Sequence, residues 1–339
     1  MFMTEDNLLE QQEQELYEHH RFVVDAGQLP MRLDQYIQMR LQGVSRNKVQ
    51  MAIDAHCVNV NDNLCKSSYK VKPQDVITIL LPEPLHEFEL EPEPIDFPVV
   101  YEDDDVVVVN KPAGLVVHPG VGNYTGTLLN GLAYRYPTPY LVHRIDKDTS
   151  GLLLVAKNEE AQTVLARQFY YHTIERRYIA LVWGDFADDE GTVTGNLARS
   201  ASDRRIMAVC DDEHGKHAVT HWHVLERFGY VTLVECVLET GRTHQIRAHM
   251  RHIGHPLFND ASYGGNGILK GVTFSKYKQF VTNCFEILPR QALHAMILGF
   301  EHPATGEHLH FEAPLPDDFA ACLAKWRAYA ASSIRPESI

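Results

Sequence analysis

The chain has 339 residues, enough for two or three domains, and its hydrophobic and charged fractions are ordinary for a globular protein. No apolar run reaches the roughly 18 to 20 residues that span a bilayer, and the acidic N-terminal region lacks a signal-peptide pattern, which argues against membrane-spanning and secreted proteins. Six cysteines are scattered without a CxxC pair, so we expect a reduced, cytoplasmic location.

The net charge of −14 is concentrated in two segments. Residues 1–30 carry −6 and residues 83–105 carry −10, so the rest of the chain is about neutral. Binding of nucleic-acid phosphates depends on local clusters of Lys and Arg, and residues 31–82 have more bases than acids. The acidic total therefore does not exclude an RNA partner.

The first predicted elements follow an acidic leader over residues 1–30, for which we expect little ordered structure. Residues 31–82 show apolar residues at helical spacing in two stretches, followed by two short strands. Their basic residues include Arg32, Arg46 and Lys48, the last two in the first turn of a helix, where a cation calls for a nearby anion. This helix–helix–strand pattern resembles the S-four-like RNA-binding module, and the resemblance implies that these three residues face phosphates.

Three more segments complete the predicted organisation. Residues 83–97 are rich in proline and glutamate and predict a stiff, extended linker. Residues 98–325 form a second domain in which strands alternate irregularly with few helices, which favours an α+β sheet over a doubly wound one. Residues 326–339 are expected to be a C-terminal tail.

The most informative segment is His143–Gly151, which runs into a five-residue apolar strand. Apolar residues without alternation predict a strand covered on both faces, so Asp146 in the preceding turn emerges at the edge of a core. On spacing alone, a structural Asx-type turn is an equally good interpretation. A later segment, Leu238–His249, decides for chemistry because Arg242 and Arg247 supply the cation that a buried carboxylate needs.

Three further segments, Asn110–Gly120, Arg176–Gly184 and Gln291–Ala295, complete an ordered set of motifs. Together the five segments resemble the signature motifs of RluA-type pseudouridine synthases over residues 98 to 319. The resemblance implies an α+β fold with a central mixed, largely antiparallel sheet, and an RNA-modifying isomerase that uses no cofactor and no metal ion. Within the family, the branch acting on large-subunit ribosomal RNA fits best, so we expect structured RNA as the partner of a monomer without membrane association.

The resemblance also implies residue roles. Asp146 is the catalytic carboxylate, as a nucleophile or as a base on the ribose, and Arg247 pairs with it, with Arg242 as the alternative partner. Tyr178 matches the tyrosine that stacks on the target base, and its hydroxyl could assist removal of the C5 proton. Arg144 would fill the gap that the extruded nucleotide leaves in the RNA.

Other functions stay open at this point. A non-catalytic S-four-type RNA-binding or ribosome-assembly protein would use the same surfaces, and a synthase acting on tRNA would carry the same motifs. Four histidines suggest a metal site, but their spacings of five, three and three do not reproduce the i, i+4 pair of a helical zinc site. They are His244, His249, His252 and His255.

Overall fold

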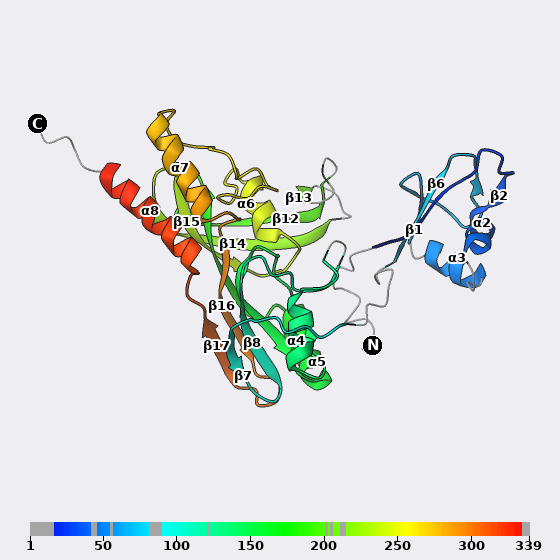
Figure 1. The fold of residues 1–339 in the computed structure, drawn as a ribbon, viewed down its shortest axis with the longest axis horizontal. Helices are drawn as coiled ribbons and strands as arrows, with labels where there is room; N and C mark the ends of the chain where they lie inside the picture. The colour runs from blue at the N-terminus through cyan, green and yellow to red at the C-terminus, as the bar shows by residue number, and fades with distance from the viewer. Residues whose placement is uncertain are drawn as a thin grey trace, which may run out of the picture. The chain divides into compact units, whose positions relative to one another are not determined.

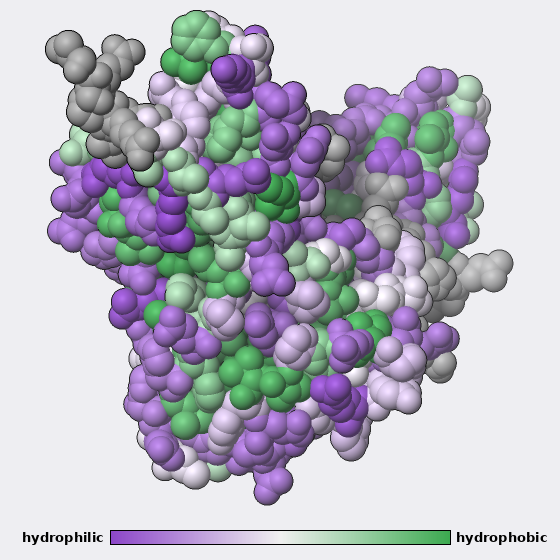
Figure 2. All heavy atoms as spheres, turned by 60° about the vertical axis from the view of Figure 1, so that its left-hand side comes forward, coloured by the Kyte–Doolittle hydropathy of each residue, from purple (hydrophilic) through white to green (hydrophobic). Residues whose placement is uncertain are grey.

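The computed structural model describes residues 17–41, 46–54, 57–81, 90–120, 123–200, 203, 206–210 and 215–333. The chain forms two compact units, divided after Glu89 (Figure 1). No helix within the described ranges is long and apolar enough to cross a bilayer. On the face drawn in Figure 2, hydrophilic residues cover most of the surface, and apolar residues appear in separate patches.

The smaller unit combines an antiparallel sheet of order β1-β6-β3-β4 with a two-stranded ribbon, β2-β5, and two helices. The elements are β1 Tyr17–Val23, β2 Met31–Arg32, α2 Leu33–Arg40, α3 Arg46–Asp54, β3 Val58–Val60, β4 Asn63–Leu64, β5 Lys70–Val71 and β6 Val76–Leu81.

The apolar residues that predicted the two helices share one core. Leu33 and Ile37 of α2 are fully buried and pack in one cluster with Val49 of α3. The turn after β3 holds Asn61 and Asp62 at φ values of 50° and 62°, a left-handed conformation that Asn and Asp adopt more readily than most residues. The turn therefore closes without a glycine.

The expectation of an unstructured leader over residues 1–30 needs correction. Residues 17–23 form β1, which pairs antiparallel with β6 from Tyr17 to Val23. β1 lies at the edge of its sheet, where backbone pairing can hold a strand that is rich in polar residues. The polar composition of residues 17–23 therefore did not indicate a strand. Residues 1–16 lie outside the described part of the chain.

The larger unit is built on a mixed sheet of eleven strands. Nine of them follow the order β13-β12-β14-β15-β11-β16-β10-β8-β7, with β17 beside β16 and β9 beside β10. Neighbours are antiparallel except β10 and β16, which run parallel. This confirms the expected α+β fold with a mixed, largely antiparallel sheet.

The strands are β7 Val99–Glu102, β8 Val106–Lys111, β9 Tyr140–Leu141, β10 Ser150–Ala156, β11 Glu175–Trp183, β12 Glu190–Arg199, β13 Met207–Cys210, β14 Lys216–Arg227, β15 Val231–Leu238, β16 Leu293–Glu301 and β17 His308–Glu312. The helices are α4 Leu128–Arg135, α5 Glu159–Tyr170, α6 Gln245–His252, α7 Ser275–Ile287 and α8 Asp317–Ser333.

Strand β10 is buried along its whole length, as its unbroken apolar run predicted. Leu153 and Val155 belong to a core cluster that also contains residues of α4 and α6, whereas Leu152 and Leu154 belong to a cluster with residues of α5. Successive side chains of a strand point to opposite faces, so both faces of β10 are covered. The loop before β10 consequently starts from a rigid base.

Both ends of the predicted catalytic domain also need correction. The predicted linker, 83–97, includes Phe97, which is buried in the core of the larger unit. The predicted tail, 326–339, begins inside α8, where Trp326 is fully buried and packs edge-on to Trp183 with 6.5 Å between ring centroids. In both segments the burial of one large aromatic residue attaches to the core a stretch whose composition is otherwise typical of a linker or tail.

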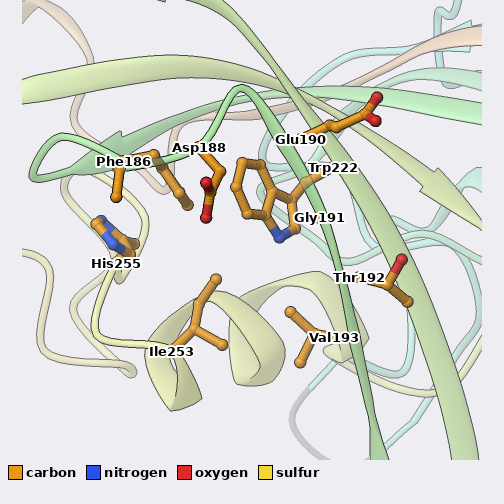
Figure 3. Close-up of a pocket in the computed structure, with 10 residues that line it drawn as sticks. Phe186, Asp188, Glu190, Gly191, Thr192, Val193, Trp222, Ile253 and His255 are labelled. Carbon is orange, nitrogen blue, oxygen red and sulfur yellow. The ribbon is translucent and has the colours of Figure 1, made fainter.

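A cavity of about 330 Å³ lies between β12, β14 and the end of α6 (Figure 3). The Phe186 ring stacks on His255 with 3.9 Å between centroids, and it packs against Trp222 at 4.4 Å. Asp188 and Glu190 also line the cavity. Their carboxylates would repel RNA phosphates, and none of the predicted site residues is in this cavity.

Candidate active site

Asp146 lies in the loop that leads from β9 into β10. The loop joins β10 at Ser150, and the next residue, Gly151, has a φ of 113° and would place a Cβ atom 2.1 Å from the Ala295 carbonyl oxygen. Gly151 pairs with Ala295 where β10 and β16 run parallel, so the two backbones meet too closely for any side chain. The glycine therefore fixes where the Asp146 loop joins the sheet.

Residues from two other motif regions support this loop through its main-chain carbonyls. The Lys111 ammonium, which is fully buried, donates to the Lys147 carbonyl at 2.9 Å, and burial lowers its pKa to about 7 against the opposing charges of nearby aspartates. Arg290 donates to the Asp148 carbonyl at 3.0 Å and is held by the Asp318 carboxylate at 2.7 Å. These two contacts anchor the main chain of the loop directly after Asp146.

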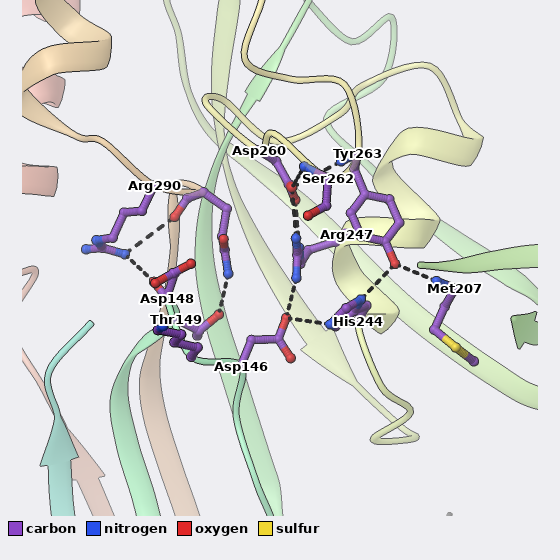
Figure 4. Close-up of polar contacts among 12 residues, drawn as sticks. Asp146, Asp148, Thr149, Met207, His244, Arg247, Asp260, Ser262, Tyr263 and Arg290 are labelled. Atoms are coloured by element: carbon purple, nitrogen blue, oxygen red, sulfur yellow. Dashed lines mark hydrogen bonds and ion pairs between the residues drawn. The ribbon is translucent and has the colours of Figure 1, made fainter. Parts of the chain in front are cut away.

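The Asp146 carboxylate is partly open, with 22% of its side chain exposed. Its Oδ2 accepts a hydrogen bond from Arg247 Nη1 at 2.9 Å, and His244 Nε2 lies 3.8 Å from the same oxygen (Figure 4). Its Oδ1 accepts no hydrogen bond from any residue that the structure describes. One oxygen is thus fixed by the protein, and the other is available to a substrate.

Charges around Asp146 keep it ionised. Burial would raise the pKa of Asp146, but the positive charges of His244, Arg247 and Arg144 hold that pKa below its ordinary value. Burial also lowers the pKa of His244, so its positive charge acts on Asp146 mainly under acidic conditions, and the permanent cation in contact at neutral pH is Arg247.

Arg247 is held between two carboxylates. Its Nε and Nη2 donate to the two oxygens of Asp260 at 2.7 and 2.9 Å, while Nη1 reaches Asp146. The Asp260 side chain is 1% exposed and also accepts from the main-chain amides of Ser262 and Tyr263. Because Asp260 already binds one edge of the guanidinium, this group has little freedom to turn away from Asp146.

Sequence reasoning did not identify Asp260 or Tyr263. The Tyr263 ring lies under the Arg247 guanidinium at 4.8 Å, and its hydroxyl contacts His244 Nδ1 at 3.0 Å. Both residues lie in an irregular loop after α6, so no helix or strand period connects them to Arg247. Only a physical argument could have predicted such a residue: a buried arginine that binds the reactive carboxylate needs a second anion to hold it in place.

Tyr178 lies in β11, paired with Cys236 of β15 and Ala295 of β16, and is 8% exposed. Burial raises the pKa of Tyr178; the charge of Arg176 opposes this effect and the charge of Asp146 adds to it. The structure therefore brings the tyrosine into the electrostatic range of the carboxylate.

The two remaining predicted arginines differ in position. Arg144 is exposed on the Asp146 loop, and its charge contributes to lowering the pKa of Asp146. Arg242 is half-buried and donates from Nε to the His217 carbonyl at 3.2 Å. The structure thus pairs Asp146 with Arg247 rather than with the alternative, Arg242.

The histidines of the metal hypothesis have separate environments. His244 contacts the Tyr263 hydroxyl, His249 contacts the Thr220 hydroxyl at 2.9 Å, and His255 contacts a main-chain carbonyl at 2.8 Å. Within the described ranges, the side chains close enough together to share a metal ion do not include any of the four. That group is Asp103, Asp105 and His302.

In the smaller unit, the predicted phosphate-facing residues Arg32 and Arg46 both bind Asp34. Arg32 donates to both Asp34 oxygens at 3.1 Å, and Arg46 donates to Oδ2 at 3.0 and 3.1 Å, joined by Gln50 at 2.6 Å. The anion that the position of Arg46 at a helix N-terminus called for is therefore present inside the chain. The side chain of Lys48 lies outside the described part.

Comparisons with known proteins identify the family of the chain. The family model described as RNA pseudouridylate synthase matches residues 105–252, and the S4 domain model matches residues 31–77. An uncharacterized RNA pseudouridine synthase, YlyB, of Bacillus subtilis is 46% identical over 87% of this chain and 94% of its own length. The ribosomal large subunit pseudouridine synthase D of Haemophilus influenzae is 42% identical over 88% of this chain and 92% of its own.

A solved structure gives the same result. Human RNA pseudouridylate synthase domain containing 1 matches with a TM-score of 0.51 and 27% identity, over 71% of this chain and 97% of its own. The family model, the relatives and this solved structure together define the class as an RNA-modifying isomerase. The chain belongs to the RNA pseudouridine synthase family, with an S4 domain in its smaller unit.

Proposed function

We propose that this pseudouridine synthase modifies uridines of large-subunit ribosomal RNA, acting as a monomer in the cytoplasm. The relatives from Haemophilus influenzae and Nitrosomonas europaea, both named ribosomal large subunit pseudouridine synthase D, are 42% identical over 92% and 87% of their lengths. The S4 domain gives the chain a second RNA-binding unit, which suits a structured RNA more than a short single strand.

We further propose Asp146 as the catalytic residue. The reaction breaks the bond between C1′ and N1 of uridine and forms a bond between C1′ and C5; C5 loses a proton and N1 gains one. The observation that carries the proposal is the Oδ1 of Asp146, which accepts no hydrogen bond from the described residues, beside an Oδ2 that Arg247 fixes. An ionised oxygen in this position can attack C1′ or remove a proton from the ribose.

The other residues follow from the needs of this reaction. Tyr178 would stack on the detached uracil and hold it while it turns, and its hydroxyl is near enough to Asp146 to share its electrostatic environment. A uridine in a helix must leave the stack before an enzyme can reach its glycosidic bond. Arg144, exposed on the same loop as Asp146, is placed to occupy the vacated position.

The test is to incubate the purified full chain with an unmodified large-subunit rRNA transcript and with total tRNA, and to map pseudouridines in each. We expect modification at a few discrete uridines of the rRNA, and none with Asp146→Asn. Modification of the tRNA alone would overturn the substrate assignment, and an active Asp146→Asn variant would overturn the catalytic one.

A further inference from the structure

Arg176 is a buried arginine two residues before Tyr178 on β11. Residues two apart in a strand point to the same face, and Arg176 and Tyr178 are 6% and 8% exposed. The guanidinium lies over the Phe169 ring at 5.5 Å, and Nη2 makes a long contact of 3.4 Å with the Glu239 carbonyl oxygen. Its Nε is buried without a hydrogen-bond partner.

No carboxylate among the described residues pairs with Arg176. The acid whose carbonyl it contacts, Glu239, directs its own carboxylate to His221 Nε2 at 2.6 Å. The other two arginines that are buried in the described ranges differ, because Arg247 binds two aspartates and Arg290 binds one. A buried cation is normally paired, so Arg176 lacks a partner that the other two have.

Two further basic side chains, His172 and Arg242, lie close enough to Arg176 for their charges to interact with it. Burial lowers the pKa of His172, and the charges of Arg176 and Arg242 lower it further; Arg242 also lowers the pKa of Arg176, after burial. His172 is exposed and Arg242 is half-buried. The residue before Arg242 is Gly241, where a Cβ atom would lie 2.4 Å from Arg176 Nη1. We call Arg176, Arg242 and His172 the basic cluster.

The basic cluster lies beside the candidate active site. The charge of Arg176 acts on Tyr178, and together with burial it lowers the pKa of His143 to about 3. His143 begins the motif that holds Asp146, and its Nε2 accepts a hydrogen bond from the Leu154 amide at 2.8 Å. A nucleotide seated between Asp146 and Tyr178 would therefore have the basic cluster next to it.

We propose that the basic cluster binds a phosphate of the RNA backbone adjacent to the uridine being isomerised, with Arg176 as the buried anchor. The inference rests on the proposed placement of the uridine between Asp146 and Tyr178. RNA carries a phosphate on each side of every nucleotide, and guanidinium groups bind phosphate oxygens with two parallel hydrogen bonds. Phosphate contacts set the register of a nucleic acid on a protein, so this contact would position the target rather than perform chemistry.

The test compares the full-length protein with Arg176→Met, Arg176→Lys and Arg242→Gln, using the unmodified large-subunit rRNA transcript. Each phosphate contact removed should weaken RNA binding and lower the slope of log Kd against log salt by about 1. We expect Arg176→Met to raise Kd and KM about tenfold, with a smaller change in kcat, and Arg176→Lys to recover part of the loss. Arg242→Gln should raise Kd about threefold.

Arg327→Met is the matched control, because Arg327 is exposed and already bound by Glu226. Unchanged Kd and salt slope in folded Arg176→Met and in Arg242→Gln would overturn the proposal, as would an equal loss in Arg327→Met. If Arg176→Met does not fold, the Arg242→Gln variant decides the outcome alone. The salt series is repeated with total cellular RNA, so a wrong substrate assignment shows as a wild-type protein that binds RNA but leaves the transcript unmodified.

Discussion

The two units of this enzyme each contain a buried cluster of aspartate and arginine, and the clusters are built in opposite ways. In the smaller unit one fully buried carboxylate, Asp34, takes donors from two half-exposed arginines and Gln50. In the larger unit one buried arginine, Arg247, is shared by two carboxylates. The first arrangement uses up the acceptor capacity of its carboxylate, whereas the second leaves Asp146 Oδ1 without a partner in the part of the chain that the structure describes.

The difference separates a structural ion pair from a reactive one. Both carboxylates have a lowered pKa although burial opposes it, so the pKa direction alone does not distinguish them. What distinguishes them is geometry: the Asp34 side chain has no exposed surface, whereas the Asp146 side chain is 22% exposed. A carboxylate that meets a substrate needs an exposed oxygen and a cation that other groups already hold in place.

The largest effect should come from removing the reactive carboxylate. Asp146→Ala should reduce isomerisation below detection and leave RNA affinity within several-fold, because the RNA is held mainly by other contacts. Release of tritium from C5-labelled uridine measures the reaction, and filter binding measures the affinity. Retained activity would show that another group acts on the nucleoside.

A smaller loss should follow when the anchor of the arginine is weakened. Asp260→Asn keeps the shape but removes the charge that grips Arg247, so we expect kcat to fall about 10- to 100-fold at similar KM, as for a group that loses its alignment. Asp260→Glu should recover part of the rate. The matched control is Asp188→Asn, at an exposed aspartate outside the site. Equal kcat values for Asp260→Asn and the control would remove Asp260 from the mechanism.

In the structural cluster the same kind of change should alter stability instead of rate. Asp34→Asn should lower the free energy of unfolding of the smaller unit by about 2 kcal/mol, the scale of hydrogen bonds to a charged group, while kcat stays near wild type. Thermal or urea unfolding, followed by hydrogen exchange of α2 and α3, measures it. A large loss of kcat at saturating RNA with unchanged stability would reverse the roles of the two clusters.

The smallest effect is a pH dependence with a definite sign. Because the pKa of Asp34 is lower in the folded than in the unfolded protein, its contribution to stability is present above the unfolded pKa of about 4 and is lost as pH falls below it. The smaller unit should therefore lose stability with acid, and Asp34→Asn should flatten that slope. An equal slope in the variant would assign the acid sensitivity to other groups.

The elements that could be predicted are those with a strong local pattern. The apolar run of β10 and the spacing of Leu33 and Ile37 indicated a strand and a helix because burial imposes those periods. β1 was not predictable in this way, since its partner, β6, is about 55 residues away and supplies backbone bonds that leave no trace in composition. Trp326 likewise packs into the core, although the mean hydropathy of the predicted tail to which it belongs is polar.

The part of the site that could be predicted likewise consists of residues in strong local sequence patterns. Asp146 and Arg247 lie in dense motifs, but their contact joins residues 101 apart, and only the family resemblance connected them. Asp260 lies in an irregular loop, and no sequence period predicts that it faces Arg247. The pattern at Arg46 was ambiguous in another way, because a helix-terminal cation indicates an anion without saying whether that anion is RNA or Asp34.

The most direct test of the account is a structure of Asp146→Asn bound to an RNA that contains the target uridine. The account predicts an extruded uridine whose ring lies on Tyr178 and whose C1′ or ribose lies about 3 to 3.5 Å from the side-chain atom that replaces Oδ1, with Arg247 still bound to Asp260. A uridine that remains stacked in the RNA, or that lies against a different carboxylate, would contradict it.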